Sequence, residues 1–261
     1  MRSIKSAERT LALFELFTKR QRPLSVGRIA AELNIPQPST SMLLSNLLQL
    51  GYISYDRFAR TYTPTIRVAL LGGWINHRFD QAGGLTARLK DLQRRVDETV
   101  FIGIQNGAHA QYIFNLPRDK PNGMQVVNGH VKLLTGSAVG RALLSLKSDQ
   151  EILKLTHRCN AEAGEARLRV VPSDFLAIVT TVRERGYAQT RGDITPDFGA
   201  FAVTVDAPHE LVPIAVGVGL PIDRIEQKRD VVIEALAELK GVFAEYIAPE
   251  AGESQDSDTA A

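Results

Sequence analysis

The first 50 residues carry three short amphipathic patterns, separated by polar or proline-containing breaks. Apolar residues at helical spacing predict a first helix that follows Ser6 and stops in the polar segment 19–23. A second, short helix is expected over residues 26–33, where the apolar positions form one face. A third helix is expected from Pro38 to Leu50, because proline suits the first turn of a helix.

After these helices the period changes from helical to alternating. YISYD and RTYTP, which are rich in Tyr, Ile and Thr and are separated by RFA, predict a β-hairpin. Three helices followed by a hairpin within about 60 residues make a winged helix-turn-helix. Helical spacing resumes over residues 66–80, in spite of the Gly72-Gly73 pair. It predicts a linker helix, which we also expect to be a dimer contact.

Beyond the linker, helical and strand patterns alternate. Asn106-Gly107 lies between two β-rich runs and is a strong hairpin signal. An antiparallel sheet with helices packed on it, the α+β arrangement, is the fold class that this order favours. The expected elements are a helix over 85–98, strand residues at 124–127, helices over 137–146 and 173–185, strands over 187–191, 200–205 and 214–220, and a long final helix over 224–247.

We therefore expect a head over residues 1–65, a linker helix over 66–82, a second domain over 83–248 and a disordered acidic tail over 249–261. The composition, 44% hydrophobic and 23% charged, is that of a globular protein, and no stretch approaches the roughly 18 apolar residues of a membrane helix. The N-terminus lacks an apolar signal core, and the single cysteine excludes an intrachain disulfide. A cytoplasmic location is expected.

Basic residues are concentrated in the head. Residues 1–75 contain ten Lys and Arg against four acidic residues, whereas the remainder contains 21 basic and 25 acidic residues. A basic head beside a slightly acidic body favours binding of a polyanion, although a head that is merely soluble is the alternative. Contacts to DNA phosphates are expected from the N-terminal arm, the second helix and the hairpin tip, namely from Arg2, Lys5, Arg28, Arg57 and Arg60.

Short polar side chains cover the free face of the third helix. Leu43, Leu47 and Leu50, with Leu44 beside them, are expected to pack on the first two helices. Gln and Asn can pair with adenine edges, Ser can donate or accept, and Met can touch a thymine methyl group. The alternative is a solvated helix surface whose Ser and Thr are ordinary caps. The expected DNA contacts on this helix are Gln37, Ser39, Thr40, Ser41, Met42, Ser45 and Asn46.

A second candidate site lies in the later part of the chain. The segment Thr135–Arg141 places small residues at a predicted helix start, where free backbone N–H groups suit an anion such as a carboxylate. Alternate strand residues are expected to face it, Ala200 and Ala202 on one strand and Gly217 and Gly219 on the other. The alternative is plain tight packing of the sheet against the helix.

Several blocks of sequence resemble the IclR family of bacterial transcription regulators over nearly the whole chain. In the head these are SAERTLALFELF, LSVGRIAAELNIPQPSTSMLLSNLLQLGYI and TPTIRVALLG. LLTGSAVGRALLSL and ERGYAQTRGDITPDFGAFAVTVDAPHELVPIAVGVGLP resemble blocks of the family's second domain. The resemblance implies a GAF-like effector-binding domain behind a winged helix, acting on operator DNA as a dimer or a dimer of dimers. It leaves open whether the protein represses or activates transcription.

The resemblance also places the effector pocket at the second candidate site. The expected ligand is a small organic acid, aromatic acids included. The chain departs from the family's pattern in two places: Met42 stands where the family usually has an arginine, and glycines 217 and 219 stand where many members have serines. The glycines predict a pocket with more room. The expected effector contacts are Thr135, Gly136, Ser137, Ala138, Val139, Asp193, Ala200, Ala202, Gly217 and Gly219.

The competing class is an enzyme. The five histidines are scattered and form no metal-ligand spacing, and GSAVG is not a nucleophile elbow because its serine stands in the second position. His157 and Cys159 lie two apart in THRCN, which we interpret as a polar loop. No catalytic residue, metal or cofactor is therefore expected. A winged helix used only for protein contact is a third possibility, which the basic head argues against.

Overall fold

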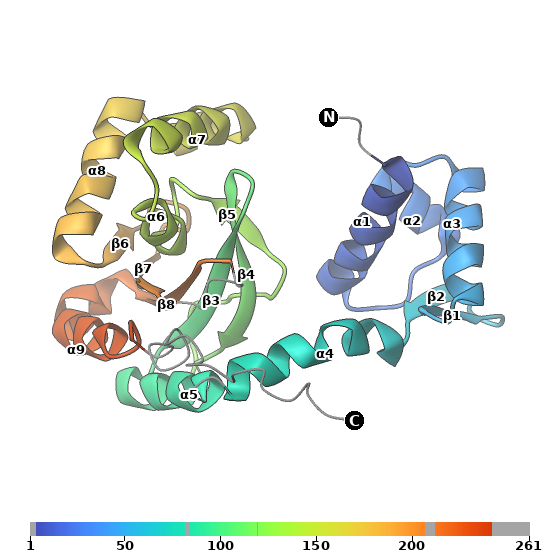
Figure 1. The fold of residues 1–261 in the computed structure, drawn as a ribbon, viewed down its shortest axis with the longest axis horizontal. Coiled ribbons are helices and arrows are strands. Elements are labelled where there is room, and N and C mark those ends of the chain that lie inside the picture. Colours follow the sequence, from blue (N-terminus) through green and yellow to red (C-terminus); the bar gives the residue numbers. More distant parts are fainter. Residues whose placement is uncertain (1–3, 82–83, 119, 207–211, 242–261) are drawn as a thin grey trace, which may run out of the picture.

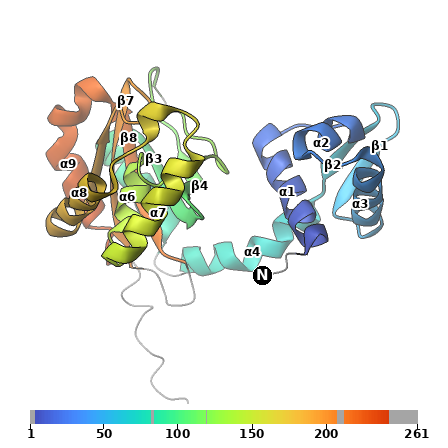
Figure 2. The same cartoon turned by 90° about the horizontal axis from the view of Figure 1, so that it is seen from above.

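The computed structural model describes residues 4–81, 84–118, 120–206 and 212–241. A small N-terminal head and a larger C-terminal domain are joined by one helix, α4 (Figures 1 and 2). The head and the joining helix comprise α1 (Lys5–Arg20), α2 (Val26–Leu33), α3 (Gln37–Gln49), β1 (Ile53–Asp56), β2 (Thr61–Pro64) and α4 (Ile66–Gln81).

The head is the predicted winged helix-turn-helix. Ser25 caps α2 by accepting a hydrogen bond from the Arg28 backbone N–H, and α3 begins and ends within one residue of its predicted bounds. Its core is formed by one fully buried residue from each helix, Leu13, Ile29 and Leu44, together with Ile53 of β1. Burying these side chains, at roughly 1.5–3 kcal/mol each, fixes α3 against the other two helices.

The linker helix α4 carries apolar side chains that this chain leaves uncovered. Ile66, Leu70 and Leu71 are all more than half exposed, and a Cβ added at Gly72 or Gly73 would meet no atom within 4 Å. The first half of α4 therefore presents an apolar surface with open space beside it. No helix in the described parts of the chain is long and apolar enough to cross a membrane.

The C-terminal domain is built on one antiparallel sheet with the strand order β5-β4-β3-β8-β7-β6. The predicted Asn106-Gly107 turn joins β3 to β4, with Gly107 at φ +59°. The elements are α5 (Leu85–Val96), β3 (Thr99–Asn106), β4 (His109–Leu116), β5 (Val131–Leu133), α6 (Ala138–Leu144), α7 (Asp149–Glu162), η1 (Ala166–Leu168), α8 (Pro172–Arg185), β6 (Ala188–Arg191), β7 (Phe198–Val205), β8 (Ile214–Pro221), η2 (Ile222–Arg224) and α9 (Ile225–Ala237).

Helices cover both faces of this sheet (Figure 1). Alternate residues of β3 face opposite sides: Val100 and Ile102 belong to the core formed with α5 and α9, and Phe101 belongs to the core formed with α6, α7 and α8. The α+β fold class predicted from the sequence is confirmed. Its sheet holds the strands that were expected to face the second candidate site.

Two local predictions are wrong. Residues 124–127 form no strand, and the strand in this region is β5, at residues 131–133. THRCN is not a loop but part of α7, whose start is fixed by a capping box between Ser148 and Glu151. The predicted final helix corresponds to α9, which ends at Ala237; the rest of that prediction beyond residue 241, and the predicted tail, lie outside the described residues.

Candidate nucleic-acid interface and ligand cavity

The outer face of α3 is polar and accessible. Gln37, Ser41, Ser45 and Asn46 are exposed and Ser39 is half-buried, as expected for side chains that approach base edges. Met42, three-quarters exposed, is the most prominent apolar side chain of this face. Apart from one threonine, the structure therefore brings together the residues predicted on α3.

That threonine, Thr40, is a correction. Its side chain is fully buried, and its hydroxyl donates to the Pro36 carbonyl oxygen at 3.2 Å. It fastens the first turn of α3 to the preceding segment and cannot reach a base. The buried face also differs from the prediction, because Leu44 is at its centre while Leu50 is half exposed. Moving the face by one position brings Thr40, Leu44 and Leu47 inward together.

Some of the residues predicted to contact phosphates are exposed, whereas one of them already forms an ion pair within the protein. Lys5, at the start of α1, and Arg57 and Arg60, in the turn between β1 and β2, are exposed. Arg28 instead forms an ion pair with Glu32 at 2.6 Å. Arg20, with Arg28 beside it, holds the pKa of the Glu32 carboxyl below its ordinary value, so part of the Arg28 charge is already offset. Arg2 lies outside the described residues.

A small cavity lies where the segment before α6 faces β7 and the segment after β6; we refer to it as the α6 cavity. Its volume is about 20 Å³, room for about one water molecule. Half of the predicted effector residues line it, namely Gly136, Ser137, Ala138, Asp193 and Ala200. Its other lining residues are Tyr112, Met124, Lys132, Thr190, Ile194, Thr195, Phe198 and Gly199.

The other predicted effector residues pack elsewhere. Thr135 is fully buried, and its carbonyl oxygen accepts a hydrogen bond from Arg141 Nε at 2.9 Å. Val139 lies against β3, where a Cβ added at Gly103 would be 2.7 Å from Val139 Cγ1. Ala202, farther along β7, lines a separate hollow. Thr135 and Val139 thus follow the alternative of tight packing between sheet and helix.

Gly217 and Gly219 do not enlarge the cavity, contrary to the expectation from sequence. A Cβ at Gly217 would overlap the Phe101 ring, and a Cβ at Gly219 would overlap Met124 Sδ. The space that serine side chains would occupy is therefore filled by larger residues from β3 and from the segment after β4. Phe101 is fully buried and contacts Tyr112 edge to face, whereas methionine is flexible and adapts its shape.

Asp193 lies on the cavity wall, but its carboxylate is engaged. Arg141 Nη2 donates to Asp193 Oδ1 at 2.7 Å, and the Arg191 backbone N–H donates to Oδ2 at 2.6 Å. Arg141 is almost fully buried and also donates to the Gln189 carbonyl oxygen. The pair joins α6 to the segment after β6, so Asp193 shapes the cavity and its charge is already balanced.

Lys132 is the cavity residue that sequence reasoning missed. Its Nζ donates to Thr195 Oγ1 at 3.1 Å, and no carboxylate of the described residues forms an ion pair with it. Partial burial lowers the pKa of Lys132, because removing the ammonium from water is unfavourable. A lysine between apolar residues in VKLL gives little sequence signal, since its partner lies 63 positions away.

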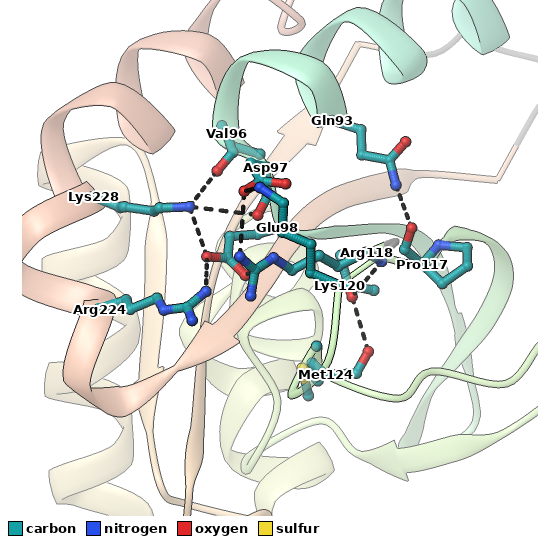
Figure 3. Close-up of polar contacts among 12 residues, drawn as sticks. Gln93, Val96, Asp97, Glu98, Pro117, Arg118, Lys120, Met124, Arg224 and Lys228 are labelled. Carbon is teal, nitrogen blue, oxygen red and sulfur yellow. Dashed lines mark hydrogen bonds and ion pairs between the residues drawn. The ribbon is translucent and has the colours of Figure 1, made fainter.

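A network of charges fixes the end of α5 to α9 (Figure 3). The Glu98 carboxylate is fully buried, and its Oε1 accepts from Lys228 Nζ at 2.7 Å and from Arg224 Nη1 at 3.1 Å. Lys228 also donates to the Val96 carbonyl oxygen at 2.6 Å, at the C-terminal end of α5. Because α5 follows the linker helix, this network holds the body of the C-terminal domain to the segment that leads to the head.

The same network reaches the α6 cavity through Thr99. Thr99 Oγ1 donates to the Met124 carbonyl oxygen at 2.9 Å and accepts from the Arg118 backbone N–H at 3.2 Å. Arg118 also forms ion pairs with Asp97 and Glu98. The backbone of Met124 is therefore fixed, while its side chain lines the cavity.

Among the described residues, the positions of His157 and Cys159 do not favour thiol chemistry. His157 is exposed, whereas Cys159 is fully buried on α7 and directs its thiol to the Ala108 carbonyl oxygen. Burial raises the pKa of the Cys159 thiol, which disfavours the reactive thiolate. Within the described residues no group of three His, Cys, Asp or Glu side chains could hold a metal ion.

The fold and these two sites define a two-domain DNA-binding regulator. The family described as "IclR helix-turn-helix domain" matches residues 6–57, and the one described as "Bacterial transcriptional regulator IclR C-terminal" matches residues 78–241. The chain belongs to the IclR family of bacterial transcriptional regulators. It is a sequence-specific DNA-binding protein with a C-terminal effector domain, and not an enzyme.

Known proteins are similar to the chain over most of its length. The Escherichia coli transcriptional repressor IclR is 22% identical over 240 residues, 87% of this chain and 83% of the repressor. The E. coli regulator KdgR is 19% identical over 80% of each chain. An IclR regulator from Alicyclobacillus acidocaldarius superposes with a TM-score of 0.78 at 19% identity, covering 93% of this chain and 99% of its own.

A further solved structure is an IclR homologue from Microbacterium hydrocarbonoxydans complexed with 4-hydroxybenzoate. It superposes with a TM-score of 0.74 at 14% identity, covering 92% of this chain and 99% of its own. These likenesses support the same two-domain fold over the parts of the chain that they cover.

Proposed function

We propose that the α6 cavity binds a small organic acid, which changes the affinity of the head for operator DNA. The observation that carries the proposal is the uncompensated cation Lys132. Asp193, the one carboxylate among the described residues that line the cavity, is bound by Arg141. A ligand carboxylate would supply Lys132 with the anionic partner that none of the described residues provides.

The cavity must enlarge before it holds more than a carboxylate group. At about 20 Å³ it has no room for an aromatic ring, and the adjustable lining residue is Met124, whose side chain covers Gly219. Rotation of that side chain would expose the glycine surface to the hydrocarbon part of the acid. The bound 4-hydroxybenzoate of the Microbacterium homologue supports an aromatic acid as one candidate.

Calorimetry against a panel of aromatic and aliphatic acids tests the ligand class. We expect at least one acid to bind at submillimolar concentration, and Lys132→Gln to weaken that binding about tenfold or more, because a charged hydrogen bond is lost. Lys154→Gln, which changes an exposed lysine on α7, is the matched control. No binding of any acid at millimolar concentration would contradict the proposal.

The DNA-binding unit is proposed to be a dimer that pairs through residues 66–80 and binds a pseudo-palindromic operator. The exposed Ile66, Leu70 and Leu71 of α4 support this pairing, since an uncovered apolar helix face fits a second copy of the chain. Leu70→Glu should shift the sedimentation profile towards monomer and weaken operator binding. A cytoplasmic location, where the bacterial chromosome lies, is part of the same proposal.

Effector action requires that the acid binds two arrangements of the heads unequally. A difference of about 1–3 kcal/mol is typical of such coupling. The size and sign of the coupling free energy can be measured by electrophoretic shifts. These use the DNA upstream of the protein's own gene, with and without the acid found by calorimetry. An acid that binds but leaves the shift unchanged would show that the cavity is not regulatory.

A further inference from the structure

The tip of the β1–β2 hairpin carries an aromatic side chain between two arginines. Phe58 is 101% exposed, more than any other large apolar residue in the described parts of the chain. Arg57 and Arg60 on either side are also exposed, and neither forms an ion pair with any other residue that the structure describes. The sequence RFAR thus presents one ring and two guanidinium groups at a point that projects from the head beside α3 (Figure 1).

The tip is held in one conformation by local hydrogen bonds. Asp56 Oδ1 accepts from the backbone N–H groups of Phe58 at 2.8 Å and Ala59 at 3.1 Å, and Arg60 reverses the chain at φ +54°. The strands are in register up to the Asp56–Thr61 pair. Because the turn is ordered before binding, little conformational entropy is lost when Phe58 meets a partner.

Charge decides which partner fits this tip. The nearest carboxylate, Asp56, is occupied by the backbone of the turn, so the two arginines give the tip a positive potential. The head is a DNA-binding domain, and the hairpin follows α3 directly along the chain. With α3 in the major groove, the tip lies at the flanking backbone and minor groove, where arginines bind and apolar side chains enter base steps.

We propose that Phe58 is a wedge that enters a base step in the minor groove and kinks the operator. The ring separates two stacked base pairs in part, while Arg57 and Arg60 hold the adjacent phosphates. Flexible pyrimidine–purine steps deform most readily, so Phe58 selects sequence at a position that α3 does not touch. This inference rests on the proposed docking of α3 in operator DNA.

The test uses full-length protein and a duplex that the wild-type chain selects from a randomised pool. End-to-end energy transfer measures the bend, and 2-aminopurine placed at steps flanking the α3 site reports unstacking. We expect wild type to bend the duplex and to raise the 2-aminopurine signal at one step. Phe58→Ala should abolish both signals and weaken binding about tenfold. Phe58→Leu, which keeps an apolar wedge, should retain part of the bend.

Leu146→Ala, at an exposed apolar residue after α6, is the matched control and should match wild type. Phe58→Ala removes no charge, so the dependence of affinity on salt should also stay at the wild-type slope. Equal bend and affinity in Phe58→Ala and wild type would overturn the inference, as would a loss of self-association in place of a loss of bend. Failure of the wild-type chain to select any duplex would instead contradict the proposed docking itself.

Discussion

Met124 Sδ occupies the space that a side chain on Gly219 would need, and the same methionine lines the α6 cavity. Gly219→Ala should therefore destabilise the protein by about 1–3 kcal/mol, because the added methyl group meets a filled space. When Met124 is also replaced by Ala, the loss of unfolding free energy caused by Gly219→Ala should be smaller than in the wild-type background. Urea unfolding of the wild type, the two single variants and the double variant measures the coupling free energy between the two positions. Strictly additive changes in unfolding free energy would contradict the contact.

The two arginines of the hairpin tip are expected to neutralise phosphates. Arg57→Ala combined with Arg60→Ala should weaken binding to every DNA sequence and lower the slope of log affinity against log salt by about two. A fluorescence titration over a range of salt concentrations measures the slope. Arg94→Ala with Arg167→Ala, both in the C-terminal domain and both at least half exposed, serves as the control. An unchanged slope would remove the hairpin from the interface.

Met42 is expected to read a base and not a phosphate. Met42→Ala should lower affinity for the selected operator by about 1 kcal/mol and leave non-specific binding unchanged, since only an apolar contact is lost. Met42→Arg should select a different sequence from a randomised pool and should not simply strengthen binding to the first one. Selection followed by competition with non-specific DNA distinguishes these outcomes.

The buried Glu98 carboxylate is expected to stabilise the C-terminal domain. Glu98→Gln leaves Lys228 and Arg224 without their shared anion, which should cost about 3–5 kcal/mol of unfolding free energy. Glu226→Gln removes an exposed carboxylate from α9 and should cost no more than about 1 kcal/mol. If Glu98→Gln lowered the unfolding free energy as little as the control does, the network would contribute little to stability.

The dependence of protein stability on pH in acid solution should reflect the ionisation of Asp97. Lys120 and Arg118 lower the pKa of Asp97 from 3.8 to about 2. A lowered pKa in the folded state adds stability above about pH 4, and this contribution disappears as the pH falls towards 2. Asp97→Asn should therefore flatten the dependence of the urea midpoint on pH in this window. Asp174→Asn, at an exposed carboxylate on α8, should keep the wild-type curve.

Periodic patterns predicted the helices of the head, the hairpin, the Asn106-Gly107 turn and the strands β6 to β8, because each of these is encoded by nearby residues. Thr40 was predicted on the exposed face of α3 but is buried. A shift of one residue around a helix is enough to move a side chain from the exposed face to the buried face. THRCN was taken for a loop because most of its residues are polar, although two of them, Thr156 and Cys159, lie on the buried side of α7.

The sequence pattern could not predict interactions between distant parts of the chain. The space over Gly217 and Gly219 is filled by Phe101 and Met124, more than 90 positions earlier. Arg141 and Asp193 are separated by 52 positions, so their pairing is visible only once the sheet has formed. Four of the five predicted residues that line the cavity are small residues near α6 and on β7, which are a local signal, whereas Asp193 was expected from the family resemblance. Lys132 was missed because its significance depends on Asp193, the carboxylate in the same cavity, being paired with Arg141.

The Thr99 hydroxyl, fully buried and bonded to the Met124 carbonyl oxygen, has a consequence for the speed of a response. With the backbone fixed there, the cavity would open by rotation of one side chain, a far faster event than the opening of a loop. An acid would then enter at a rate set by its own concentration, and the occupancy of the regulator would follow changes in acid level without a delay from the protein.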